Sequence, residues 1–517
     1  MTSTLTPYRS SLPPGRAGFA QLLRAEWAKF WTVWRLLAGL LLAALVVAGL
    51  SVLAAGGSNV GDPQGTHHTI GPGGMRVNDS FRFVHRPLTG DGSITAEVAS
   101  LTAATEREGG VRPEPWAKAG VMIKQSVKAG APYAAMLFTP GHGVRLQYDF
   151  THDQAGTGPS GARWLRLTRH GPVLTGYVSA DGEHWTRTGS VRPHGLGGTV
   201  QVGVFAASPD HLEVQRQFGS TSEAGSGVKA TGRFEHVSLQ GVQAGAAWRG
   251  TTIGFAGDPN DFTSPRARAA KASAGSSHVA GDTVTATGTG DIGPFTDPAD
   301  PVQTSMQGVF VGVLVVAALG ALFVTAEYKR GMIRTTLSAS PRRGRVLVAK
   351  ALVVGAVTFA VALPATAIAF PLAQHRLQSN GFRPPLFPRY GLTDPISLRV
   401  VIGSAAILAL VAVLAMAVGA LLRHSAAAIT LVIVAIVLPQ ILAFALPLGP
   451  SSWLLRVTPA AAFAVQQGAS HPEQVAHTCL PEDGCYPLAP WPGFSVLAAY
   501  TVVLLALAVW RIRRRDA

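Results

Sequence analysis

Six long stretches without a charged residue constrain the fold of this 517-residue chain more than any other feature. An α-helix rises about 1.5 Å per residue, so about 20 apolar residues cross the ~30 Å hydrocarbon core of a bilayer. Only 14% of the residues are charged, whereas soluble proteins carry about 25%. The chain is therefore predicted to be a polytopic membrane protein, with transmembrane helices at 36–55, 308–326, 351–373, 400–422, 426–448 and 494–510.

Lys and Arg set the predicted orientation of these helices. With both termini in the cytoplasm, the segments 1–35, 327–350, 423–424 and 511–517 face the cytoplasm and hold 17 Lys and Arg against three acidic residues. Short cytoplasmic loops carry such an excess of positive charge. We therefore expect a multi-pass protein of the plasma membrane. The isoelectric point of about 10.4 comes from these membrane-flanking segments, so nucleic-acid binding is not expected.

The large segment 56–307, predicted to lie outside the cell, has the pattern of a β-rich domain. Short runs alternate apolar and polar residues, as in 93–99 and 199–205, and turns rich in Gly, Pro and Asp separate them. Period-2 runs at this spacing indicate an antiparallel β-sandwich, and Asp181-Gly182 is typical of a hairpin turn. For residues 246–307, edge strands of this sandwich and a stalk both remain open.

The order of five sequence runs within about 81–241 is fairly specific: TGDGSITAEV, PWAKAGVMIK, MLFTPGHGVRLQYD, WLRLTRHG and YVSADGEHWTRTGS. Together they resemble the extracellular concanavalin-A-like (laminin-G-like) jelly-roll modules of bacterial surface proteins, which implies such a sandwich over 56–245. The predicted fold class is thus mixed, with six transmembrane helices and a large extracellular all-β jelly-roll sandwich inserted between the first and second spans. Some modules of this kind bind glycans and others are structural. Trp116, Trp164 and Trp185 are candidates for sugar stacking, although core or rim aromatics are the favoured interpretation.

Motifs for chemistry are missing from the sequence. There is no G-x-x-x-x-G-K-[ST] phosphate loop, no G-x-S-x-G nucleophile elbow and no H-E-x-x-H zinc helix. The run GTGDIG at 288–293 matches a dinucleotide pattern by spelling, but the prolines that follow it cannot open the required helix. We expect no catalytic residue, no metal and no cofactor in this chain, which is therefore not predicted to be an enzyme.

The two cysteines, Cys479 and Cys485, lie in the predicted outer loop between the fifth and sixth spans. Pro and Gly between them allow a turn that brings the two sulfurs together, and a disulfide is chemically permitted outside the cytoplasm. A redox-active pair is the alternative, but the spacing is not C-x-x-C. We expect a structural disulfide.

The loop 327–350 joins the second and third spans on the predicted cytoplasmic side. On a helix, Met332, Ile333 and Leu337 fall on one side of this loop, and its first Lys and Arg residues project elsewhere. An apolar stripe on a cytoplasmic segment predicts a surface that docks onto a partner. Lys350, at the mouth of the third span, is expected to reach the membrane surface with its long side chain.

This loop, AEYKRGMIRTTLSASPRRGRVLVAK, closely resembles the loop between the second and third spans of ATP-binding-cassette type-2 transporter permeases. The match falls on Glu327, Gly331, Ile333, Leu337, Pro341, Arg342, Arg343 and Lys350. The N-terminal run LLRAEWAKFWTVW, with Glu26, Trp27 and Lys29, resembles the amphipathic elbow helix of the same family, here placed within 1–35. The resemblance covers 18–55 and 306–515 and leaves out the outer domain.

The resemblance implies the permease subunit of an ATP-driven exporter. A separate ATP-binding subunit would hold ATP and Mg²⁺ and contact the elbow helix together with Glu327, Gly331, Met332, Ile333 and Leu337. Two permeases, identical or different, would line one pathway in the lipid. The alternative is a membrane-anchored surface protein that binds glycan or cell wall, or senses the state of the envelope, through its sandwich. The scarcity of charge in the spans favours an apolar or amphipathic cargo.

Overall fold

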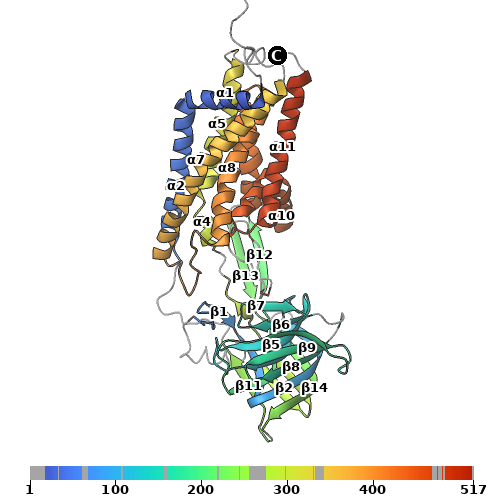
Figure 1. The fold of residues 1–517 in the computed structure, drawn as a ribbon. Coiled ribbons are helices and arrows are strands. Elements are labelled where there is room, and N and C mark those ends of the chain that lie inside the picture. Colours follow the sequence, from blue (N-terminus) through green and yellow to red (C-terminus); the bar gives the residue numbers. More distant parts are fainter. Residues whose placement is uncertain are drawn as a thin grey trace, which may run out of the picture.

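The fold was examined in a computed structural model of the chain. The structure describes residues 18–32, 34–60, 68–105, 109–156, 161, 163–217, 220–243, 245–254, 275–296, 299–329, 331, 343–468, 474–475, 480 and 484–514. A helix bundle occupies one end of the molecule and a β-rich region the other (Figure 1). Helix α1 (Phe19–Thr32) and the C-terminal end of the last helix lie at the end of the bundle far from the β-rich region (Figure 1).

Six helices in the described part of the chain are long and apolar enough to cross a membrane, which confirms the prediction of six such helices. They are α2 (Trp34–Gly57), α5 (Gly308–Lys329), α7 (Arg343–Ser379), α8 (Pro395–Leu422), α9 (Ser425–Ala445) and α11 (Pro490–Arg514). Helix α7 is much longer than the predicted 351–373, because its first two turns carry Arg and Lys and its last turns are polar. The shorter helices are α4 (Pro301–Thr304), α10 (Leu448–Val457) and the 3₁₀ helix η1 (Pro459–Gln466).

Helix α8 forms the centre of the bundle. Within its most apolar window 78% of the residues are buried, against 22% in α2 and in α11. Small residues let its neighbours approach closely: a Cβ added to Gly320 of α5 would lie 2.1 Å from the backbone oxygen of Ala412 in α8. Close backbone approach through small residues is typical of helix packing in lipid, where water does not drive association.

The β-rich region, called the β region below, is antiparallel throughout its described pairs. Its strands are β1 (Val77–Asp79), β2 (Phe81–Thr105), β3 (Gly109–Val111), β4 (Lys118–Lys124), β5 (Tyr133–Thr139), β6 (Gly143–Tyr148), β7 (His152–Ala155), β8 (Trp164–His170), β9 (Val173–Ser179), β10 (Thr186–Val191), β11 (Thr199–Ala207), β12 (His211–Gln217), β13 (Ser220–Ser226), β14 (Val228–Val242), β15 (Arg249–Ile253), β16 (Gly275–Ala280), β17 (Thr283–Gly288) and β18 (Ile292–Pro294). This region and the six helices together confirm the mixed class.

One long strand organises the β region. Strand β2 pairs with β8, β11, β14 and β15 along its 25 residues, within a 14-stranded sheet whose main order is β10-β9-β8-β2-β11-β4-β5-β6-β7. The pairs β1–β18 and β12–β13 form two small sheets. In the segment 246–307, β15 adds to β2, β17 adds to β14, and β16 pairs with β17.

Strands β4, β5 and β11 are buried on both faces. In β11, Val204 belongs to one apolar cluster and its neighbour Phe205 to another; in β5, Met136 and Leu137 divide in the same way. Successive side chains of a strand point to opposite faces, so the sheet has a core on each side. Their sequences therefore read as nearly continuous apolar runs.

Backbone and side-chain contacts join the β region to the bundle. The Arg76 N–H donates to the carbonyl of Pro385 at 2.9 Å, and the Lys118 ammonium donates to the carbonyl of Gln474 at 3.1 Å. The β12–β13 hairpin lies between the bundle and the rest of the β region (Figure 1) and contacts α9. The two parts of the molecule are thus bonded to each other at several points.

Candidate functional site at the far end of the helix bundle

Four charged side chains from three helices meet at the end of the bundle far from the β region. Lys350 of α7 donates from Nζ to Glu26 Oε2 of α1 at 2.7 Å and to Glu327 Oε1 of α5 at 2.6 Å. Lys29 of α1 donates to Glu26 Oε1 at 3.1 Å and lies 3.8 Å from Glu327 Oε1. We call these four residues the charge cluster.

The charge cluster is largely buried. Lys350 is 1% exposed, Glu26 2% and Glu327 8%, whereas the side chain of Lys29 is 43% exposed. Buried charges are tolerated only when they are paired and hydrogen-bonded, because leaving water is costly for each ion. Two ammonium groups and two carboxylates cancel in formal charge, so the cluster as a whole is neutral.

Aromatic rings lie beside the cluster. The Lys350 ammonium is 5.1 Å from the centre of the Phe323 ring, and Phe30 of α1 packs on Phe323 with 5.8 Å between ring centres. Glu26 and Phe30 are four residues apart and so share a face of α1; they are its buried residues. A neighbouring side of the helix carries Trp27 and Trp31, which are 46% and 55% exposed.

The arrangement ties three helices together through side chains alone. Oε2 of Glu327 is buried and has no hydrogen-bond partner among the described residues, so the cluster still holds an unused acceptor. Moving α1, α5 or α7 relative to the others would separate ions in a dry site, which costs more than separating them in water. The cluster therefore opposes the separation of these three helices.

The structure joins some of the residues singled out in the sequence and not others. Glu26, Lys29 and Glu327 lie in the charge cluster, while Trp27 is exposed and contacts Trp31 instead. Gly331 is exposed, with a φ of +69° that suits glycine. Met332, Ile333 and Leu337 lie outside the described residues, so the stripe they were predicted to form stays a prediction.

The expected position of Lys350 is wrong. Its side chain does not reach the surface; it is 1% exposed and bonded to two glutamates. The physical reason is that α1 and α5 bring two carboxylates to it, which offset the cost of burial. A lysine at the start of a long apolar helix, in a chain that has matching acids near two other helices, is the signal that could have indicated this pairing.

The three candidate sugar-stacking tryptophans are all in contact with side chains of the β region itself. Trp116 is 6% exposed, and His142 stacks on its ring with 3.8 Å between ring centres. His236 stacks on Trp164 at 5.2 Å, and the Arg166 guanidinium lies 3.8 Å from the ring centre of Trp185. These contacts account for the rings as packing residues, and sugar binding stays a prediction.

The predicted disulfide concerns a partly described loop. Cys485 is 6% exposed and disulfide-bonded. Cys479, the other cysteine of the chain, lies outside the described residues. The pairing of Cys479 with Cys485 stays a prediction.

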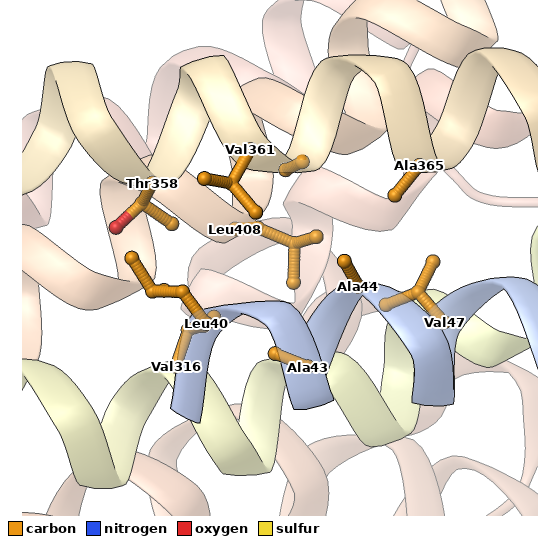
Figure 2. Close-up of a pocket in the computed structure, with 10 residues that line it drawn as sticks. Leu40, Ala43, Ala44, Val47, Val316, Thr358, Val361, Ala365 and Leu408 are labelled. Carbon is orange, nitrogen blue, oxygen red and sulfur yellow. The ribbon is translucent and has the colours of Figure 1, made fainter. Parts of the chain in front are cut away.

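An apolar pocket lies inside the bundle, between α2, α5, α7 and α8 (Figure 2). Helix α2 lines it with Leu40, Ala43, Ala44 and Val47, and Leu408 of α8 lines another side. Thr358 of α7 brings a hydroxyl group to the lining. The lining is almost wholly apolar, and the cavity has room for no more than about one water molecule.

Comparisons with known proteins add little. No protein family and no curated protein matches the chain. Among solved structures, the chain is similar to the crystal structure of a functionally unknown protein from Saccharomyces cerevisiae, at 19% identity over 32% of this chain and 77% of that one. The TM-score of 0.18 is too low to support any argument about fold or function.

Proposed function

We propose that this chain is the transmembrane permease subunit of an ATP-driven exporter of the ATP-binding-cassette type. The charge cluster is the observation that carries this proposal. It links α1, which matches the elbow helix of the family in sequence, to the ends of α5 and α7 that flank the loop 330–342. A separate ATP-binding subunit binds this end of the bundle and supplies the ATP and Mg²⁺.

The position of the loop explains how a partner would act. Glu327 lies on α5 three residues before it, Lys350 lies on α7 eight residues after it, and the two side chains are bonded to each other. A subunit that binds the loop differently in its ATP-bound and ATP-free states would shift the helices between arrangements, since a ligand biases only states that it contacts differently. The scarcity of charged residues in the spans supports an apolar or amphipathic cargo.

A substitution in the loop tests the partner. Ile333→Asp should release the ATP-binding subunit, because losing a buried interface anchor commonly costs more than about 1–2 kcal/mol. The chain is purified from native membranes in mild detergent, and ATPase activity is measured in the eluate. Arg343→Ala is the control, at the first residue of α7, and should retain most of the ATPase activity. Wild-type activity with Ile333→Asp would contradict docking on this loop.

Orientation has its own test. The β region and the pair formed by α1 and the end of α11 lie at opposite ends of the bundle (Figure 1), which supports an extracellular β region and cytoplasmic termini. That the β region is a jelly-roll sandwich is part of the proposal and rests on the sequence resemblance. A cysteine at position 220 should react with a membrane-impermeant reagent in intact cells, and one at position 340 should not. Labelling at 340 alone would reverse the proposed orientation.

A second candidate role, sensing by the β region, is favoured by one contact. Lys118 is fully buried and forms an ion pair with Asp291 of the β region. Its ammonium also donates to the carbonyl of Ile292 in the β region and to that of Gln474 in the loop before α11. A change in the β region would therefore reach the bundle directly. Lys118→Met should alter export while leaving the ATP-binding subunit bound; unaltered export would argue against sensing through this contact.

A further inference from the structure

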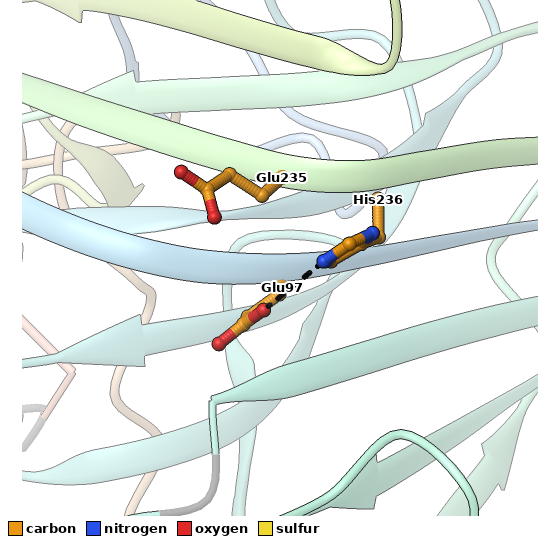
Figure 3. Close-up of side chains that lie close together, drawn as sticks. All are labelled: Glu97, Glu235 and His236. Carbon is orange, nitrogen blue, oxygen red and sulfur yellow. Dashed lines mark ion pairs between the residues drawn. The ribbon is translucent and has the colours of Figure 1, made fainter.

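Two glutamates and a histidine converge on the surface of the β region (Figure 3). Glu97 lies on β2, and Glu235 and His236 lie on β14. One ligand atom from each lies within 4.8 Å of the other two. Nε2 of His236 is directed at Oε2 of Glu97, 4.0 Å away (Figure 3).

The second ring nitrogen of His236 and the face of its ring also have contacts. Its Nδ1 lies 3.6 Å from Oδ2 of Asp282, in the turn between β16 and β17. Its ring stacks on Trp164 at 5.2 Å with 13° between the planes. Histidines that bind metals generally donate their second ring N–H to a carboxylate, which fixes the ring and leaves the other nitrogen for the metal.

The strand register makes this site electrostatically unusual. Glu97 and Glu235 are direct partners across the β2–β14 pair, and like charges directly opposite each other are destabilising. A bulge then follows, since the next partners are Ser238 and Thr95. The bulge holds His236 at a φ of +54° and turns it toward the two glutamates.

Charge at the site is not balanced by the nearest cation. Arg233 donates to Glu235 Oε1 at 2.8 Å, but Glu97, Glu235 and Asp282 bring three carboxylates to His236. The side chains of Glu97 and Glu235 are 30% and 32% exposed, so an ion from solution can reach them. A divalent cation between the two opposed carboxylates would remove their repulsion.

We propose that Glu97, Glu235 and His236 bind a divalent transition-metal cation of the Zn²⁺ class. One imidazole nitrogen and two carboxylate oxygens suit Zn²⁺, with water completing a four-coordinate site. Ca²⁺ and Mg²⁺ take oxygen ligands and have no use for the imidazole. This site is independent of the proposed export function, because it lies in the β region and its ligands do not belong to the charge cluster.

Zinc titration of the full chain tests the proposal. The protein is purified in detergent without a polyhistidine tag, and Zn²⁺ is titrated against a chromophoric chelator. Glu97→Gln and His236→Gln should each lose one tight equivalent, and Asp282→Asn should weaken binding by about 10–100-fold. His184→Gln is the control, because His184 forms an exposed pair with Asp181 elsewhere in the β region and should leave the tight equivalent unchanged.

A stability measurement keeps the test independent of folding defects. Zn²⁺ should raise the unfolding temperature of the wild type and not that of Glu97→Gln. Without metal, Glu97→Gln should be at least as stable as the wild type, because it removes one of two opposed charges. The proposal is overturned if Glu97→Gln and His236→Gln bind Zn²⁺ like the wild type, or if His184→Gln loses the same equivalent. It is also overturned if Ca²⁺ binds to His236→Gln as tightly as Zn²⁺ binds to the wild type, because the imidazole would then not be needed as a ligand.

Discussion

The helix bundle and the β region both bury lysines, but they satisfy them in different ways. Lys350 in the bundle is held by the side chains of Glu26 and Glu327, which come from two other helices. Lys124 in the β region is held by Asp79 Oδ2 at 2.8 Å and by the carbonyl of Ala131 at 2.8 Å. Asp79 in turn accepts from the backbone N–H of Gly130 at 2.6 Å.

This difference lies in what must be displaced for each ion pair to break. Bonds between side chains of separate helices break and re-form when the helices shift, whereas bonds to the backbone persist as long as the sheet is folded. Burial raises the pKa of Asp79 and lowers the pKa of Lys124, and their mutual attraction opposes both shifts. The charge cluster therefore depends on the placement of three helices, and the Lys124 pair depends on the fold of the β region.

The largest expected effect comes from removing the central cation of the cluster. Lys350→Met leaves Glu26 and Glu327 buried without their shared partner and should lower the free energy of unfolding by about 3–5 kcal/mol. Unfolding in detergent measures this effect. Adding Glu26→Gln and Glu327→Gln removes the stranded charges, and the triple variant should regain most of the stability. If Lys350→Met were as stable as the wild type, the bundle would not depend on Lys350 to pair its two buried glutamates.

A somewhat smaller effect is expected in the β region, with a different rescue. Lys124→Met leaves Asp79 buried and should cost about 3 kcal/mol of unfolding free energy. Adding Asp79→Asn should restore only part of the loss, because the carbonyl of Ala131 is left without its donor, at about 1–3 kcal/mol for an unsatisfied buried group. Full rescue, measured by the same unfolding experiment, would remove the distinction between the two regions.

How much the sequence could predict depends on the range of the interactions. The absence of charge over some 20 residues is a local signal, and it located all six apolar helices; it missed the polar ends of α7, where Arg343–Lys350 and Gln374–Ser379 continue the helix. The alternating pattern located strands such as β8, whose burial alternates along its length. Runs such as 119–124 indicated strands as well, but their burial on both faces depends on neighbours distant in sequence.

The candidate sites depend on contacts between residues that are still farther apart in the sequence. Lys350 and Glu26 are 324 positions apart, so no local pattern reveals that they meet. The metal-site candidate requires the register that places Glu97 opposite Glu235 and the bulge at His236. The Asp181-Gly182 turn was predicted correctly between β9 and β10, because turn chemistry is local; the loop is longer than a two-residue hairpin, with Gly182 at a φ of +82°.

An intermediate effect is expected for Cys479 and Cys485, which lie in the loop before α11. Cys485→Ser should lower the free energy of unfolding by about 2 kcal/mol, since so short a closed loop gives a modest gain. A non-reducing digest of the wild type, analysed by mass spectrometry, should contain the linked peptides of Cys479 and Cys485. Two free thiols would contradict the disulfide, and the loop before α11 would then lack its covalent constraint.

The smallest expected effect lies on the exposed surface of the β region, at the Asp181 turn. Asp181 Oδ1 accepts from the backbone N–H groups of Glu183 and His184, both at 2.9 Å, and from the hydroxyl of Ser179. These bonds, led by that from the His184 backbone, hold the pKa of Asp181 well below its usual value of 3.8. The unfolded chain therefore takes up the proton first, so the stabilisation is present above about pH 3.8 and is lost as the pH falls through the folded-state pKa.

Asp181→Asn should unfold at a slightly lower temperature than the wild type near neutral pH, and the gap in unfolding temperature should close in acid. Glu183→Gln, which removes a neighbouring charge without touching these bonds, should show no such pH-dependent gap; a gap of Asp181→Asn that stayed constant into strong acid would mean that the turn depends on shape and not on the ionised carboxylate.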